Sequence, residues 1–218
     1  AEIMEEFMSN RICRKISFTG STEVGKQLMR RGSEQVKRLS LELGGHAPVL
    51  VFPDVDIEAA AKVSVIGKFR NNGQVCICPT RFYAEESIEK DFLEACIEET
   101  KKITLGNGLD DGVDVGPMFE SRAMDKAEAI IQDAVGKGAN CVLGGGRSTR
   151  FEKGYFFEPT VLTEINRSMK IMTDEPFAPI LPVLSFSGID EAIAEANNTN
   201  FGLAAYVLTN DLTAAMKC

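Results

Sequence analysis

Segments with the hydrophobic pattern of strands alternate along this chain with segments that have the pattern of helices. The strand-like runs lie at 14–18, 38–43, 48–52, 140–143, 156–163, 180–186 and 205–208. The helix-like runs lie at about 26–32, 57–69, 87–103, 124–134 and 189–196. Such alternation indicates an α/β protein, in which helices cover a largely parallel sheet. A chain of 218 residues, 44% of them hydrophobic, can bury a sizeable core as one large domain or as one domain and part of another.

The charge of the chain limits the partners that it can bind. Its 32 acidic residues outnumber its 24 basic ones, for a formal net charge of −8, whereas nucleic-acid binding needs a basic face. No run approaches the roughly 20 apolar residues of a membrane-spanning helix. The acidic start, Ala1–Phe7, lacks the basic region of a signal peptide. We therefore expect no nucleic-acid partner and no membrane insertion.

The spacing of the cysteines indicates the cellular compartment, and the patterns at the two chain ends indicate whether the chain is part of a longer protein. The six cysteines, at 13, 76, 78, 96, 141 and 218, are not spaced as a disulfide framework, so we expect a cytoplasmic protein. Ala1–Met8 has the pattern of a helix without a start signal, and Asp211–Cys218 begins a helix that has no cap. Both features predict that the chain is a piece of a longer protein.

A glycine-containing turn follows the first strand-like run, in the sequence Phe18-Thr-Gly-Ser-Thr-Glu-Val-Gly25. Small residues at a strand-to-helix junction let backbone N–H groups at a helix N-terminus approach a phosphate. The sequence is not the GxGxxG fingerprint of dinucleotide-binding proteins. Taken alone, the glycines are better explained by a plain strand-to-helix turn.

A glutamate, Glu42, stands near the end of the strand-like run 38–43, before the pair Gly44-Gly45, which permits a sharp reversal of the chain. A carboxylate at the end of a buried apolar strand has a raised pKa, as a general base near neutral pH requires. The alternative is an exposed glutamate on an edge strand, and the residues alone do not separate the two.

A cysteine, Cys76, lies in the polar loop Asn71-Asn-Gly-Gln-Val-Cys76-Ile-Cys78. Loop placement gives a thiol access to ligands, and nearby N–H dipoles favour its thiolate form. Cys-x-Cys also occurs in metal sites, but the chain has no second cysteine pair and a single histidine, His46, so we expect no metal. One histidine also leaves little room for a Cys–His pair, which makes Glu42 the natural base for a Cys76 nucleophile.

Taken in order, five motifs resemble the aldehyde dehydrogenase superfamily. They are FTGSTEVGK (18–26), LELGG (41–45), FRNNGQVC (69–76), EPFAP (175–179) and NFGLAAYV (200–207). The resemblance runs from about Arg11 to the C-terminus, and the spaced glutamate and cysteine motifs are highly specific as a pair. It implies an aldehyde dehydrogenase-like catalytic domain at 41–218, with three layers and a mixed or parallel sheet. It also implies that 1–40 is the tail of a Rossmann-like NAD(P)-binding domain.

The resemblance implies that Cys76 attacks an aldehyde and that hydride then passes to NAD or NADP, which leaves a thioester on Cys76. Glu42 would activate the water that releases the carboxylic acid. Ser21 would contact the cofactor pyrophosphate, and Glu175 the ribose on the nicotinamide side. The other implied cofactor-binding residues are Gly20, Gly25, Leu43 and Phe177.

The resemblance also implies what the family's longer chains contain: most of the cofactor domain, an asparagine of the oxyanion hole and an oligomerisation strand. Because the loss of oxyanion donors alone lowers rates by ~10²–10³, we expect negligible dehydrogenase turnover from these residues by themselves. We expect the full-length form to be a homo-oligomer. One departure from the family is Ala178, where the family usually has glycine.

Arg70, six positions before Cys76, makes the chain most similar to succinate-semialdehyde dehydrogenases and related enzymes. In those, the matching arginine receives the distal carboxylate of the substrate, a role that suits a planar, always-charged guanidinium group. The alternative is an ion pair between Arg70 and an internal acid. The resemblance implies that the small-molecule substrate is succinate semialdehyde or a related carboxylated semialdehyde.

Two other functions are compatible with the sequence. Cys76 could hydrolyse activated esters as a cofactor-independent thiol esterase, or the chain could be a non-catalytic fragment that retains the fold. Cys78 could also form a strained, easily reduced disulfide with Cys76 under oxidation.

Overall fold

The protein, described by a computed structural model over residues 2–218, divides into two compact units, Ala1–Gly44 and Gly45–Cys218. The assignment of 1–40 to a cofactor-binding domain and of 41–218 to a catalytic domain stays a prediction. Within residues 2–218, no helix has the length and apolar character that crossing a bilayer requires.

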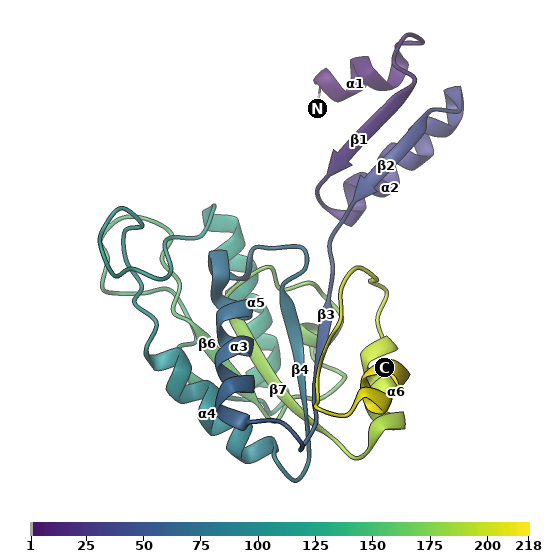
Figure 1. Cartoon of the computed structure of the whole chain (residues 1–218). Coiled ribbons are helices and arrows are strands. Elements are labelled where there is room, and N and C mark those ends of the chain that lie inside the picture. Colours follow the sequence, from purple (N-terminus) through teal and green to yellow (C-terminus); the bar gives the residue numbers. More distant parts are fainter. Residues whose placement is uncertain (1) are drawn as a thin grey trace. The chain divides into compact units, whose positions relative to one another are not determined.

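The smaller unit is a β–α–β unit preceded by a helix (Figure 1). It contains α1 (Glu2–Ser9), β1 (Lys15–Thr19), α2 (Thr22–Gly32), the short 3-10 helix η1 (Ser33–Gln35) and β2 (Arg38–Glu42). The two strands pair in parallel, with Thr19 opposite Glu42 at their C-terminal ends. Its small buried core consists of Met8, Ile16 and Leu28.

A six-stranded sheet forms the centre of the larger unit, in the order β5-β6-β7-β4-β3-β8. The strands are β3 (Ala47–Val51), β4 (Pro79–Glu85), β5 (Asn140–Leu143), β6 (Thr160–Thr163), β7 (Ile180–Phe186) and β8 (Tyr206–Leu208). Neighbouring strands are parallel except for β5 and β6, which are antiparallel, so the sheet is mixed.

Helices pack on both faces of this sheet, which gives three layers (Figure 1). One buried cluster joins α3 (Ile57–Phe69) and α4 (Glu89–Lys101) to residues such as Val49 and Phe82. The other joins α5 (Ser121–Gly136) and α6 (Ile189–Asn197) to Leu50 and Tyr83, the next residues along the same strands. The short elements are η2 (Arg70–Gly73), η3 (Lys170–Met172) and α7 (Leu212–Lys217). The α/β architecture with a mixed sheet is thus confirmed.

Most predicted segments agree with the structure within a few residues. α3 has the predicted bounds 57–69, and the side chain of Asp56 caps its start by accepting a hydrogen bond from the N–H of Ala59. The strand-like run 156–163 contains a shorter strand, β6. The helix predicted at the start of the chain is α1, except for Ala1, which lies outside the described residues.

The hydrophobic pattern does not predict β4, although this strand lies in the interior of the sheet. A proline begins the strand and an arginine interrupts its apolar run. Arg81 is nevertheless fully buried, because its guanidinium group donates hydrogen bonds to the carbonyl oxygens of His46, Glu195 and Ala196. A buried charge is tolerated only where such bonds replace hydration. The partners are remote in sequence, so no local pattern could indicate them.

Candidate active site

Cys76 is partly buried in the loop between the end of α3 and the start of β4. The loop opens with η2, where Asn71, Asn72 and Gly73 have left-handed backbone conformations with φ of 51°, 58° and 70°. Asparagine and glycine adopt this region more readily than other residues. A Cβ atom at Gly73 would lie 2.4 Å from the carbonyl oxygen of Ala178, so the close approach requires glycine. The Asn-Asn-Gly sequence therefore turns the chain sharply from the helix toward Cys76.

Side chains of the same loop are tied to the segment 116–119. Asn72 is buried and donates hydrogen bonds to the carbonyl oxygens of Gly116 and Pro117, at 2.9 and 3.1 Å. Oε1 of Gln74 accepts a hydrogen bond from the N–H of Phe119 at 3.1 Å. Such support matters at a reactive site, because loose positioning lowers the rate of a reaction.

Three of the sequence motifs meet at Gly45. Its N–H donates a hydrogen bond to Oε1 of Glu175, with 3.2 Å between nitrogen and oxygen. A Cβ atom at Gly45 would lie 2.4 Å from the carbonyl oxygen of Cys76. The second glycine of LELGG therefore touches both the cysteine loop and the first residue of EPFAP.

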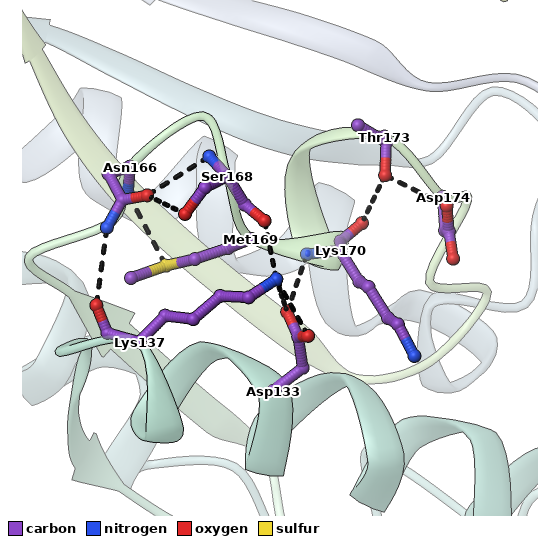
Figure 2. A network of polar contacts seen from close by, with 8 residues as sticks. All are labelled: Asp133, Lys137, Asn166, Ser168, Met169, Lys170, Thr173 and Asp174. Carbon is purple, nitrogen blue, oxygen red and sulfur yellow. Dashed lines mark hydrogen bonds and ion pairs between the residues drawn. The ribbon is translucent and has the colours of Figure 1, made fainter.

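A polar network holds the segment that leads to Glu175 against α5 (Figure 2). Asp133 accepts a hydrogen bond from the N–H of Lys170 at 2.8 Å and forms an ion pair with Lys137 at 2.8 Å. These two contacts, with Lys137 the stronger, lower the pKa of Asp133. Lys137 also donates to the carbonyl oxygen of Ser168 at 2.5 Å. The end of α5 is thus linked to the residues just before the EPFAP motif.

Phe177 and Ala178 differ in backbone conformation. Phe177 has a φ of 41°, and its side chain is 42% exposed. Left-handed aromatic residues are uncommon, and such strained conformations cluster at functional sites. Ala178 has no positive φ, and its methyl group is fully buried in the core. Alanine therefore fits at this position in place of the glycine that the family resemblance implies.

Glu42 and several predicted cofactor-binding residues lie in the smaller unit, near the ends of β1 and β2. The hydroxyl of Ser21 caps α2 by accepting a hydrogen bond from the backbone at 3.4 Å. The N–H of Gly20 donates to the carbonyl oxygen of Glu42 at 3.0 Å. Gly25 packs so tightly against Leu43 that a Cβ atom would lie 2.6 Å from Cδ2. The side chain of Glu42 is exposed, which agrees with the alternative that the sequence leaves open and not with a buried carboxylate.

A cavity of about 150 Å³ lies beside the cysteine loop. Cys78 lines it and Cys76 does not. Arg70 also lines the cavity and is exposed, and its guanidinium group makes no hydrogen bond or ion pair with another residue of the described chain. The hydroxyl of Tyr206 donates to the carbonyl oxygen of Ile77 at 2.7 Å and so fixes one side of the loop. The remaining lining residues are Val49, Val63, Ser64, Gly67, Val75, Pro79 and Leu208.

Lys68 is a residue near the site that the motifs do not predict. It is fully buried, and its Nζ lies 3.5 Å from Sγ of Cys78. Burial lowers the pKa of Lys68, and the charges of Cys78 and Glu175 act in the opposite direction. A signal was present in the sequence, because Ala61, Val65 and Lys68 have the i, i+4, i+7 spacing of one helix face. A lysine on an otherwise apolar face indicates a buried charge.

The two cysteines of the loop are free thiols, Cys76 partly buried and Cys78 buried. Sγ of Cys78 donates to the carbonyl oxygens of Lys68 and Pro79, at 3.4 and 3.3 Å. A redox bond between the two cysteines stays a prediction. Over residues 2–218, the structure contains no group of three or more His, Cys, Asp or Glu residues arranged to hold a metal ion.

The mixed sheet with helices on both faces defines the chain as an α/β protein. The model of the aldehyde dehydrogenase family matches residues 1–218, so the chain belongs to that family. It is 44% identical to glutarate-semialdehyde dehydrogenase of Pseudomonas aeruginosa, over 97% of this chain and 43% of that protein. It is 43% identical to an NADP(+) succinate-semialdehyde dehydrogenase of Escherichia coli, over 95% of this chain and 43% of that protein.

A solved structure of a relative has the same fold. Succinate-semialdehyde dehydrogenase from Burkholderia pseudomallei superposes with a TM-score of 0.94 at 41% identity, covering 97% of this chain and 44% of that one. The chain thus spans less than half the length of the relatives that it matches.

Proposed function

We propose that this chain supplies the nucleophile and the substrate-binding arginine of an NAD(P)-dependent dehydrogenase that oxidises succinate semialdehyde or a related carboxylated semialdehyde to the acid. The names of its relatives support this substrate class, because glutarate and succinate semialdehydes both carry a carboxylate at the end opposite the aldehyde. The proposal concerns an activity of the whole enzyme, of which these residues form one part.

The observation that carries the proposal is the unpartnered guanidinium group of Arg70. An arginine with a structural role would be expected to pair with an acid, and Arg70 makes no such contact with a described residue. It lies on the wall of the cavity next to the loop of the candidate nucleophile. A guanidinium group can bind a carboxylate through two parallel hydrogen bonds, which suits the distal end of a semialdehyde.

In this mechanism Sγ of Cys76 attacks the aldehyde carbon, and the proton of the thiol is transferred to the carbonyl oxygen, to give a thiohemiacetal. Loss of hydride from that carbon and of the hydroxyl proton leaves a thioester on Cys76. Glu42, acting as a general base, then takes a proton from water as the water attacks the thioester and releases the carboxylic acid. The exposed position of Glu42 leaves its carboxylate accessible to water. The covalent intermediate divides one difficult oxidation into easier steps.

The residues present fit NAD or NADP as the cofactor. In the smaller unit, α2 begins at a strand-to-helix junction with Ser21 as its cap, and the N-terminus of a helix favours a pyrophosphate. In the larger unit, Glu175 would accept hydrogen bonds from a ribose. The bound nicotinamide ring supplies the acceptor for hydride. The other proposed cofactor-binding residues are Gly20, Gly25, Leu43 and Phe177.

Thiohemiacetal formation needs no cofactor, so it can be tested on the 218-residue chain. Succinate semialdehyde and butanal, which has the same carbon number but no carboxylate, are compared as protectants of Cys76 against iodoacetamide, with the modified peptide followed by mass spectrometry. We expect the semialdehyde to protect at a concentration about tenfold or more lower, because a hydrogen bond to a charged group contributes about 1.5–3 kcal/mol. Arg70→Ala should make the two aldehydes equivalent.

Arg122→Ala is the matched control, because Arg122 is an exposed arginine that pairs only with Glu120. This variant should keep the preference for succinate semialdehyde. A preference that survives Arg70→Ala would refute the carboxylate-binding role, and failure of both aldehydes to protect Cys76 would refute its assignment as nucleophile. Steady hydrolysis of p-nitrophenyl acetate at Cys76 without cofactor would favour a thiol esterase instead.

A further inference from the structure

A buried ammonium group lies directly beneath the loop that carries Cys76. Lys68 is the penultimate residue of α3, and its side chain has no exposure to solvent. Its Nζ lies 3.1 Å from the point where a Cβ atom at Gly73 would stand, and the carbonyl oxygen of Ala178 lies 2.4 Å from that point. The ammonium group, the left-handed turn and the EPFAP segment therefore meet at one place.

The loop is fixed at the two residues that follow Cys76. The carbonyl oxygen of Ile77 accepts a hydrogen bond from Tyr206, and Sγ of Cys78 lies 3.5 Å from Nζ of Lys68. Cys78 also donates to the carbonyl oxygen of Lys68, so this lysine contacts the cysteine through both its side chain and its backbone. The position of the Cys76 backbone depends on these anchors, because Cys76 lies one residue before Ile77 and two residues before Cys78.

We propose that Lys68 is a positioning residue for the nucleophile: its buried ammonium group holds the loop at Cys78 and so fixes the backbone that presents Cys76. This inference rests on the proposed role of Cys76 and adds a residue to it. A buried lysine loses hydration, and such a desolvated charge interacts strongly with nearby groups.

The groups that titrate around this cation come from several elements. Cys78 and Glu175 favour its protonated form, whereas burial opposes it. His46, at the start of β3, is affected by the charge of Lys68 and is itself held neutral, with its pKa lowered to about 3 mainly by burial. The pKa of Tyr206 is raised by burial and by both thiols of the loop. The charge of Lys68 therefore acts on both the cysteine loop, at Cys78, and the EPFAP segment, at Glu175.

The test compares Lys68→Met with the wild-type chain. Methionine has a similar length without the charge, but removing one member of a buried polar cluster lowers stability, so the two chains are compared at a temperature at which both are folded. We expect a cooperative thermal transition at a lower temperature than that of the wild type, with slower alkylation of Cys76 in the folded variant at every pH. Lys62→Met, which removes an exposed lysine from the same helix, should change neither quantity.

A folded Lys68→Met chain that alkylates Cys76 at the wild-type rate would overturn the inference, because a purely structural lysine would change stability and not the reactivity of the folded chain. If that variant does not fold, Cys78→Ala tests the same contact: slower alkylation of Cys76 at every pH supports the positioning role, and an unchanged rate contradicts it. The proposed function fails separately, if Cys76 of the wild-type chain reacts no faster than the exposed thiols of Cys141 and Cys218.

Discussion

The guanidinium group of Arg81 donates two hydrogen bonds to the carbonyl oxygen of His46, from Nε at 3.0 Å and from Nη2 at 2.9 Å. It also donates to the carbonyl oxygens of Glu195 and Ala196, at 3.1 and 2.8 Å, where α6 ends. Cations are favourable at this end of a helix, and Arg81 gives the carbonyl groups there donors in addition to the N–H of Asn198, which bonds to Glu195. Through His46 it also fixes the start of β3, next to Gly45.

Arg81→Met should therefore destabilise the chain. The substitution removes these hydrogen bonds and leaves several buried carbonyl oxygens without donors. We expect a loss of about 3–5 kcal/mol in the free energy of unfolding, as measured by urea denaturation. Arg122→Met, at an exposed position, should change it by less than about 0.5 kcal/mol. A loss below about 1 kcal/mol for Arg81→Met would show that water or a rearranged α6 replaces the arginine.

His46 should make stability depend on pH below neutrality. Its Nδ1 lies 2.8 Å from Oγ1 of Thr80, and burial, followed by the charge of Arg81, lowers its pKa to about 3. In the unfolded chain it takes up a proton near its ordinary pKa of about 6.5. Stability should thus be fully present above pH 6.5 and fall as the pH decreases toward 3, by at most about 1.4 kcal/mol per pH unit.

Because the chain contains a single histidine, a change of stability with pH near the pKa of histidine can be assigned to His46. Urea denaturation between pH 7 and pH 5 should show this slope in the wild type, and His46→Asn should remove most of it. NMR signals of the imidazole ring should not titrate above pH 5. An imidazole that titrates near pH 6.5 in the folded protein would contradict the buried neutral state.

Gly73→Ala should disturb the cysteine loop through the backbone alone. Gly73 has a φ of 70°, and a Cβ atom there would meet the carbonyl oxygen of Ala178 at 2.4 Å. We expect a loss of about 2 kcal/mol or more in the free energy of unfolding, together with slower alkylation of Cys76. Gly108→Ala is the control, because a Cβ atom at Gly108 would have no neighbour within 4 Å. Equal effects of the two substitutions would rule out the close contact as the cause.

The sequence predicted those parts of the fold that local patterns encode. The bounds of α3 follow from the Pro53-Asp54 break and the apolar residues that follow it. β4 could not be predicted in this way, because its central arginine is tolerated only through carbonyl groups more than 100 residues away in the sequence. The hydrophobic pattern of a sequence indicates which residues form the apolar part of a core. It does not indicate the hydrogen bonds that buried polar side chains make with residues remote in the sequence.

The site could be predicted in part. The motifs marked the residues that the structure brings together around Gly45, namely Cys76 and Glu175. Lys68 was not predicted, since the motifs start after it and its contact with Cys78 depends on the left-handed turn. Of the two alternatives that the sequence left open for Glu42, the structure has the exposed side chain, because an apolar strand sequence does not reveal whether the end of the strand is covered.

Alkylation of the six cysteines as a function of pH, resolved by mass spectrometry, tests the central claim most directly. The account predicts that Cys76 reacts first. Exposed Cys141 and Cys218 should react more slowly near neutral pH, because partial burial raises the pKa of each. If Cys76 reacts no faster than these two, the chain does not hold an activated nucleophile, and the account is contradicted.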